Sequence, residues 1–210
     1  VELLESCIAR IEAVDGAVNC MVTRAYDRAR EEAKVAEQMV VDGEELGLLH
    51  GLPMGIKDLE ATEGIRTTWG SLPTKDTVPE ADQGSVAAVR AEGAILLGKT
   101  NTPEFGAGAN TKNRVFGATG NPFNPELTCA GSSGGSAVAL ATGMVPIASG
   151  SDYGGSLRTP AGFCGVVGFR PSPGTVPAEG KAAALMPWSV LGPMARTVAD
   201  TALLLQAQMD

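Results

Sequence analysis

Beyond about residue 50, short apolar segments alternate with glycine-rich turns and helical patterns, and this alternation limits the chain to few fold classes. A helical face repeats about every 3.6 residues, whereas a buried strand is a continuous apolar run. The predicted strands are 94–97, 144–148 and 165–169, and the predicted helices between them are 85–92 and 136–141. Strands that alternate with helices are typical of layered α/β domains. The sequence therefore predicts an α/β fold with helices flanking a β-sheet.

The first forty residues have a different pattern, which is typical of two helices. Leu4, Ile8 and Ile11 share one helical face, and the pair Asp15-Gly16 predicts the end of this helix. A second helix is predicted from about residue 21 to 41, where alanines lie among charged residues of a solvated face.

The change of pattern divides the chain into two parts. We predict an N-terminal helical segment, residues 1–47, and a core, residues 48–210. The core ends in another helical pattern, in which Val198, Ala202 and Leu205 share a face. The chain starts at Val1 and stops within this pattern, so we expect it to be part of a longer protein.

Histidine is nearly absent, and this excludes several catalytic designs. His50 is the one histidine among 210 residues, so a zinc site built on several histidines cannot form within the chain. A Ser-His-Asp hydrolase would have to use His50 or a histidine outside the chain. We expect neither a metal nor a cofactor.

Charge and cysteine content narrow the partners and the compartment. The net charge of −8 lacks the basic footprint of a nucleic-acid-binding protein. No run of about 18 apolar residues predicts a membrane-spanning helix, and no signal peptide is visible. The four cysteines lack metal-type spacing, which favours free thiols in a reducing compartment, and we predict a cytoplasmic protein. The sequence leaves open whether the chain forms a homo-oligomer.

Residues 93–100, GAILLGKT, match the letters of a phosphate-binding P-loop but not its physics. A P-loop needs an open loop whose N–H groups cradle phosphate and which begins a helix. Here the middle residues form an apolar strand pattern, and Pro103 disfavours a helix directly afterwards. We therefore discard nucleotide binding and interpret Lys99 as a structural or surface lysine.

Residues 131–135, GSSGG, fit the nucleophile elbow G-x-S-x-G. An elbow needs a strand before it, a helix after it, and an acid and a histidine later in the chain. The histidine of this chain lies upstream, which weakens this interpretation without excluding it, because a histidine could lie beyond residue 210.

Three segments carry the chemistry that remains: LHGLPMGIKDL at 49–59, CAGSSGGSA at 129–137 and GSDYGGSLRTPAGFCG at 150–165. A serine nucleophile needs a base, and without a spare histidine the strong candidate is a lysine. Burial among apolar residues lowers the pKa of a lysine, and Lys57 follows such residues. Strand alternation places Asp58 on the opposite face. Gly154 and Gly155 allow backbone N–H groups to form an oxyanion hole beside Ser156.

The chain resembles the amidase signature family of serine hydrolases. The motifs are GIKD at 55–58, GSSGGSA at 131–137 and DYGGSLRTPAGFCG at 152–165, with further likeness in LHGLP, in KTNTPEF at 99–105 and in GPMARTVADTALLL at 192–205. The resemblance runs from about residue 48 to the C-terminus. It implies a mixed β-sheet core flanked by helices, which is incomplete in this chain because family members are typically more than twice as long.

The resemblance also implies a Ser-Ser-Lys triad that cleaves a small-molecule carboxamide to a carboxylate and ammonia or an amine. Ser156 would be the nucleophile that forms an acyl-enzyme, Lys57 the base, and Ser132, beside a cis peptide bond, the bridge between them. The remaining implied roles are oxyanion-hole N–H groups at Tyr153, Gly154, Gly155 and Ser156, loop-bracing positions at Ser133, Asp152 and Arg158, and an acyl-pocket position at Gly106.

Four departures from the family pattern affect these expectations. Thr159 stands where glutaminase subunits of transfer-RNA amidotransferases tend to carry glutamine, which disfavours that alternative function. Tyr153 replaces a small or β-branched residue, and Cys129-Ala130 replaces Pro-Gly, with Cys129 interpreted as a packing residue. The short length and Tyr153 leave a second alternative, a catalytically inactive amidase-like fragment.

Overall fold

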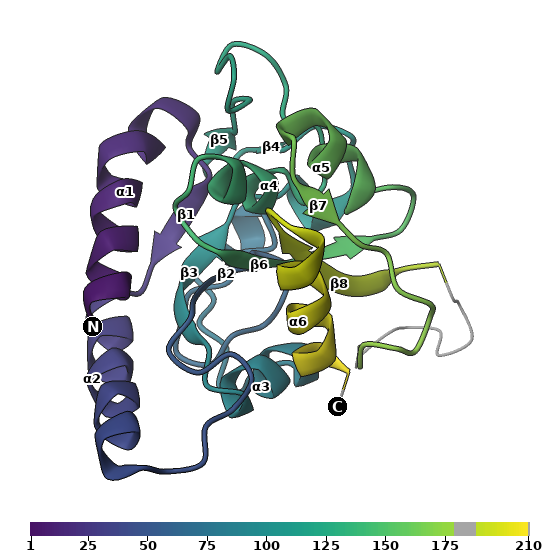
Figure 1. Cartoon of the computed structure of the whole chain (residues 1–210). Helices are drawn as coiled ribbons and strands as arrows, with labels where there is room; N and C mark the ends of the chain where they lie inside the picture. The colour runs from purple at the N-terminus through teal and green to yellow at the C-terminus, as the bar shows by residue number, and fades with distance from the viewer. Residues whose placement is uncertain (179–187, 210) are drawn as a thin grey trace.

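A six-stranded sheet forms the centre of the computed structural model, which describes residues 1–178 and 188–209. The strand order is β1-β3-β2-β6-β8-β7. Strands β3, β2 and β6 are parallel, whereas β1, β8 and β7 each run antiparallel to their neighbours (Figure 1). The strands are β1 (Met21–Arg24), β2 (Pro53–Lys57), β3 (Ile95–Thr100), β6 (Ile147–Asp152), β7 (Val167–Gly168) and β8 (Val190–Ala195), and a separate pair is β4 (Lys112–Asn113) with β5 (Gly117–Ala118). The α/β prediction with a mixed sheet is confirmed.

Helices cover both faces of the sheet. They are α1 (Glu2–Val18), α2 (Tyr26–Asp42), α3 (Gly84–Ala91), α4 (Gly134–Ala141), α5 (Arg158–Cys164) and α6 (Val198–Gln208), with short 3-10 turns at Leu72–Thr74 and Glu104–Gly106. Residues of α1, α2, α4 and α5 share one buried cluster, and α3 and α6 contribute to a second one. Alternation along β3 links the two layers, because Ile95 and Leu97 belong to the first cluster and Leu96 to the second.

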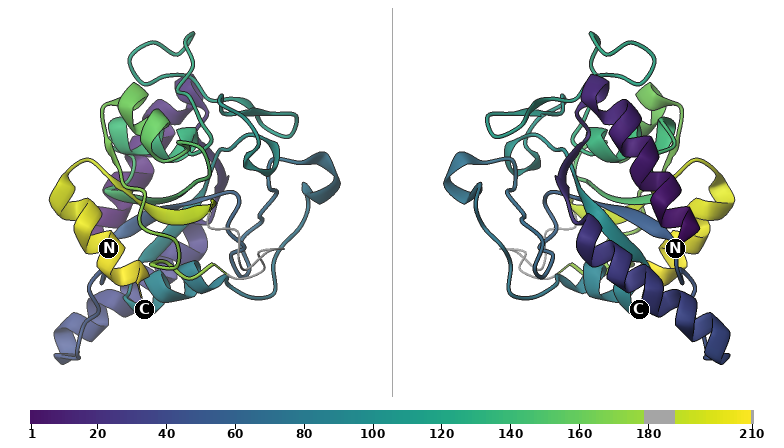
Figure 2. Two further views of the ribbon diagram at one scale, coloured as in Figure 1. Left: turned by 90° about the vertical axis from the view of Figure 1, so that its right-hand side faces the viewer. Right: turned by 90° about the vertical axis from the view of Figure 1, so that its left-hand side faces the viewer.

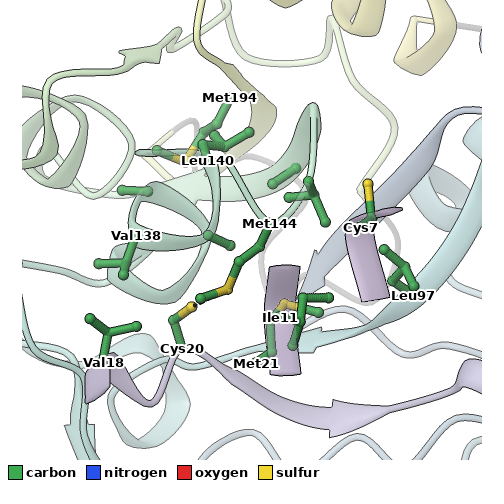
Figure 3. Close-up of a cluster of buried hydrophobic side chains, with 14 of the residues drawn as sticks. Cys7, Ile11, Val18, Cys20, Met21, Leu97, Val138, Leu140, Met144 and Met194 are labelled. Carbon is green, nitrogen blue, oxygen red and sulfur yellow. Dashed lines mark hydrogen bonds between the residues drawn. The ribbon is translucent and has the colours of Figure 1, made fainter. Parts of the chain in front are cut away.

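The first cluster joins the N-terminal helix to the catalytic half of the sheet. Figure 3 shows Cys7 and Ile11 of α1 near Leu97 of β3, with Met144 and Cys20 in the same cluster. Figure 2 shows α1 and α2 along the flank of the molecule, and the two helices contact each other. The division of the chain at residue 48 stays a prediction.

The predicted N-terminal boundaries are wrong in two places. Helix α1 continues through Asp15-Gly16 to Val18, because Asp15 is buried and its carboxylate accepts the N–H groups of Cys20 and Met21 at 2.7 and 3.0 Å. Residues 21–24, predicted as helix, form strand β1, which pairs with β3, and α2 begins only at Tyr26. The pairing with a distant strand outweighs the local helical pattern.

The remaining elements agree with their predictions in kind and differ in their ends. Helices are confirmed as α3 and α4, and β3 continues beyond residue 97 through Gly98 and Lys99 because both are buried between two strands. The strand predicted at 144–148 begins only at Ile147, after Pro146, which has no N–H for the sheet. The strand predicted at 165–169 is reduced to β7, since Gly165 ends α5 with a positive φ.

Two C-terminal features differ from the sequence pattern. Strand β8 was not predicted, because Gly192 and Pro193 interrupt its apolar run. Helix α6 is confirmed, but Val198 is 73% exposed and the buried face carries Thr201, Leu204 and Ala207. Within the described ranges, no helix is both long and apolar enough to cross a membrane.

The start of α4 approaches the end of β3 so closely that only glycine fits. A Cβ atom on Gly135 would lie 2.2 Å from the backbone nitrogen of Asn101 and 2.6 Å from its oxygen. We expect Gly135→Ala to destabilise the protein by about 2–3 kcal/mol, as overpacking a buried contact does. Chemical denaturation measures this, with Gly162→Ala in α5 as the control, because a Cβ there meets nothing within 4 Å. Equal stability of the two variants would contradict the close-approach argument.

Candidate active site

Lys57 is the last residue of β2 and has no exposed surface. Its Nζ lies 2.7 Å from Ser132 Oγ, 2.9 Å from Ser133 Oγ and 2.9 Å from Ser151 Oγ. Three hydroxyls therefore surround the amine and can accept its hydrogens. In the neutral amine, the lone pair of Nζ can take a proton from one of these hydroxyls.

Burial lowers the pKa of Lys57 from 10.5 to about 7. The carboxylates of Glu60 and Asp152 act in the opposite direction and keep the pKa from falling further. Asp58 is turned to the other side, where its carboxylate accepts Thr68 N–H at 3.0 Å and the Thr68 hydroxyl at 2.5 Å. Lys57 can consequently exchange a proton near neutral pH.

Ser132 lies in the loop that leads into α4. The peptide bond between Gly131 and Ser132 is cis, and Ser132 is buried. The next residue, Ser133, joins this loop to the loop of Ser156: its N–H donates to the Ser156 carbonyl at 3.2 Å, and its hydroxyl donates to the Ser151 carbonyl at 3.2 Å. These contacts hold Ser132 and Ser156 beside the same space.

Ser156 follows two glycines and precedes α5, and it is half-buried. Its side chain faces a cavity of about 270 Å³ that Ser132 also lines. The other lining residues are Leu59, Phe105, Gly106, Ala107, Ser151, Tyr153 and Ser189. An ideal Cβ on Gly106 would lie 3.6 Å from Ser132 Oγ, so a glycine at this position leaves room beside the hydroxyl.

Asp152 braces the loop that carries Ser156. Its carboxylate accepts the N–H groups of Gly155 at 2.8 Å and Leu157 at 3.1 Å, and both Nε and Nη2 of Arg158 at 3.0 and 3.1 Å. Burial alone would raise the pKa of Asp152, but the Arg158 and backbone hydrogen bonds bring it far below its usual range. Asp152 is therefore ionised and fixes the turn of the loop.

Sequence reasoning missed Arg170, which lies beside this brace. The guanidinium contacts the Asp152 carbonyl, donates to the Asp152 carboxylate at 3.1 Å, and donates to the Trp188 carbonyl at 3.0 Å. Arg170 thus ties the Ser156 loop to the start of β8. No local motif marks it, because its partners are 18 residues away on either side.

The predicted site residues come together with one exception in detail. The N–H of Gly155 donates to Asp152 and is therefore not free to bind an oxyanion. The residues that we discarded lie outside the cavity lining: His50 Nε2 lies 2.8 Å from the Ala36 carbonyl, and Lys99 is buried inside a strand and not in a phosphate loop. Cys129 is buried, and burial raises the pKa of its thiol to about 11, which leaves it unreactive.

The elbow interpretation fails on the same geometry. Residues 129–133 are not a strand, so no strand leads into Ser133. Within the part of the chain that is described, no group of three or more His, Cys, Asp and Glu side chains is arranged to hold a metal ion.

A buried lysine, two serines and a glycine-rich loop at the ends of parallel strands define a hydrolase site of the amidase type. The chain matches the Amidase family over residues 2–210 and belongs to that family. The match extends the resemblance from residue 48 to the N-terminal helices.

Relatives and solved structures agree with this family. A glutamyl-tRNA(Gln) amidotransferase protein of Alkaliphilus metalliredigens is 43% identical over 205 residues, which cover 98% of this chain and 42% of the relative. The acylamidase of Rhodococcus erythropolis is 41% identical over 97% of this chain and 43% of the relative. A bacterial aryl acylamidase of the amidase signature family superposes with a TM-score of 0.94 at 39% identity, over 99% of this chain and 44% of that structure. The chain thus spans less than half the length of the proteins it matches.

Proposed function

We propose that this protein hydrolyses a carboxamide through an acyl-enzyme on Ser156. The observation that carries the proposal is the buried Lys57, whose pKa is about 7 and whose Nζ lies 2.7 Å from Ser132 Oγ beside the cavity of Ser156. A base of this pKa is half neutral at neutral pH, where an ordinary lysine is almost fully protonated.

The proposed first half-reaction forms an ester on Ser156. Ser156 Oγ attacks the carbonyl carbon while its proton passes to Ser132 Oγ and the Ser132 proton passes to Lys57 Nζ. When the tetrahedral intermediate collapses, the C–N bond breaks and Lys57 returns the proton through Ser132 to the leaving nitrogen. Water then attacks the ester by the same proton route and releases the carboxylate.

Negative charge develops on the substrate oxygen during both steps. We assign its stabilisation to the backbone N–H groups of Tyr153, Gly154 and Ser156, since the N–H of Gly155 is taken by Asp152. Asp152, Arg158 and Arg170 act by holding this loop, and Ser133 by joining it to the loop of Ser132.

The rim of the cavity favours substrates with an apolar, planar group. Tyr153 and Phe105 line the cavity with exposed rings, and Tyr153 meets Trp188 edge-to-face at a centroid distance of 6.1 Å. Aromatic rings of this kind stack well on aryl groups. An anilide or aryl-acyl amide is therefore the substrate class that we propose.

Tyr153→Ala tests this class. We expect kcat/KM for an anilide to fall about tenfold or more, with less than about a twofold change for a small aliphatic amide, because only the anilide loses a ring contact. Phe163→Ala is the matched control: Phe163 is also an exposed ring but does not line the cavity. An equal loss on both substrates would contradict the aromatic specificity and indicate damage to the loop.

A glutaminase component of an amidotransferase is the second candidate. It is favoured by the 43% identity to the Alkaliphilus metalliredigens protein, and disfavoured by Thr159. The two functions differ in substrate: a glutaminase releases ammonia from glutamine, whereas the amidase prefers the aryl amide. Comparing the two rates separates them.

The proposed function is tested by labelling with a fluorophosphonate, which reacts with activated serines. We expect mass spectrometry to find one adduct, on Ser156. A folded chain that is neither labelled nor active on any amide would overturn the proposal and support the alternative of an inactive amidase-like fragment. We also propose a cytoplasmic location, supported by four buried free cysteines.

A further inference from the structure

Four charged side chains are buried around the end of β2, and the proposed reaction uses only Lys57. The other three are Asp58, Glu60 and Lys99, each at most 1% exposed. A buried charge is costly unless it has partners, so each one needs a structural reason. Asp58 is accounted for by Thr68. Glu60 is the group that connects to Lys57.

Glu60 contacts both backbone polar groups of Lys57. Its own N–H donates to the Lys57 carbonyl at 3.0 Å and closes the turn after β2. Its carboxylate oxygen Oε1 accepts the hydroxyl of Ser149, and Ser149 Oγ accepts the Lys57 N–H at 3.0 Å. The main chain at Lys57 is thereby held on both sides by a single residue.

The hydrogen-bond directions show that Glu60 is a carboxylate. Ser149 Oγ accepts from Lys57 N–H, so its own hydrogen is free to go to Oε1. Ser85 Oγ lies 2.9 Å from Oε2 and receives the Gln83 side-chain amide at 3.3 Å, so its hydrogen goes to Oε2. Both carboxylate oxygens therefore accept, as the ionised form requires.

Lys99 supplies the compensating charge from β3. Its Nζ contacts the Glu60 main-chain carbonyl and lies 2.6 Å from Thr62 Oγ1, which pins the turn of Glu60 to the sheet. Lys99 also interacts electrostatically with Asp58 and Glu60. The turn is thus fixed by a buried cation on one side and by two serines on the other.

The charged groups that act on Lys57 are few. Glu60 acts from the turn and Asp152 from β6, and Glu60 has the larger effect of the two. Asp152 is neutralised by Arg158 and Arg170, whereas Glu60 is shared between Lys57 and Lys99. The polar neighbours of Lys57 Nζ are otherwise the uncharged hydroxyls of Ser132, Ser133 and Ser151.

We propose that Glu60 is a positioning residue for the Lys57 base: its carboxylate fixes the backbone of Lys57 through Ser149, and its charge sets the pH range in which Lys57 is neutral. The inference rests on the proposed function, because it assigns Glu60 a role through Lys57. Neither the three motifs nor the family comparison assigns a role to Glu60.

Glu60→Gln is the decisive variant, since it keeps the shape and removes the charge. Removing a negative charge disfavours the ammonium form of Lys57, so Lys57 loses its proton at lower pH. We expect the acid limb of the fluorophosphonate labelling rate to move down by about half a pH unit or more, and the maximal rate to fall about threefold, because a weaker base is a poorer proton acceptor. Glu63→Gln, an exposed acid in the same segment, is the control and leaves the limb in place.

Direct titration of Lys57 separates this inference from the proposed function. With lysine labelled at 13Cε, the NMR signal of Lys57, assigned by its loss in Lys57→Met, gives the titration midpoint without any turnover. A wild-type chain that is never labelled on Ser156 overturns the proposed function alone. A Lys57 midpoint in Glu60→Gln within about 0.2 pH unit of wild type overturns the role of Glu60.

A second variant covers the case in which Glu60→Gln does not fold. Glu60→Asp keeps the charge but is one methylene shorter, so it loses the contact with Ser149. We expect labelling about tenfold slower than wild type, with the acid limb nearly unchanged, because geometry is lost and charge is kept. Wild-type labelling by Glu60→Asp would overturn the positioning role.

Discussion

Ser156→Ala is expected to lower kcat/KM for amide hydrolysis by about 10⁴-fold or more and to abolish fluorophosphonate labelling. The loss is large because the proposed nucleophile has no substitute, and members of a catalytic unit each carry most of its effect. Ser132 lines the same cavity, but its hydroxyl contacts Lys57 and is the proton bridge in the proposed route. Steady-state kinetics and intact-mass labelling measure the effect.

The control for this variant is Ser172→Ala, because Ser172 is exposed and far from the cavity lining. Its kinetics should equal those of the wild type. Thermal unfolding should show that Ser156→Ala melts within about 2 °C of the wild type, since a half-buried hydroxyl contributes little to stability. Labelling at another serine in Ser156→Ala would refute the assigned nucleophile.

Lys57→Met is expected to lower kcat by about 10³-fold or more, since no other described group near Ser132 can take its proton near neutral pH. In the wild type, activity should rise with pH through about 7, because the neutral amine is the active base. This acid limb should vanish in Lys57→Met. Measurement of kcat/KM between about pH 5 and 9 checks both points.

Lys57→Arg distinguishes a base from a structural cation. Arginine keeps the positive charge and cannot be deprotonated in a protein, so a base is lost while a cation is kept. We expect the arginine variant to be as inactive as Lys57→Met. Lys75→Met, which removes an exposed lysine, should retain full activity. Substantial activity in Lys57→Arg would contradict the base assignment.

The alternation of apolar runs and helices was sufficient to predict the class of fold, and the missing histidine directed attention to Lys57. The chain-distant features could not be predicted in this way. Strand β1 forms because Met21–Arg24 pairs with β3, about 75 residues later, and this outweighs a local pattern typical of a helix. Gly192 and Pro193 hide β8 because their local preferences oppose a strand.

The same distinction applies to the candidate site. Lys57, Ser132 and Ser156 stand in motifs that can be read locally, and their side chains meet as expected around one site. Glu60 and Arg170 act only through residues that the sheet brings to them, Ser149 in one case and Asp152 in the other. An acidic or basic letter in a sequence carries no sign of such a partner.

The order of the strands makes the site a reporter of completed folding. Strand β2 lies between β3 and β6, so Lys57 reaches Ser132 and Ser151 only after segments 75 and 94 residues apart have docked (Figure 1). A collapsed or partly assembled chain has a solvated lysine of ordinary basicity and a serine of ordinary inertness. The yield of Ser156 labelling during refolding would therefore count native molecules, and intermediates that already contain helices would stay silent.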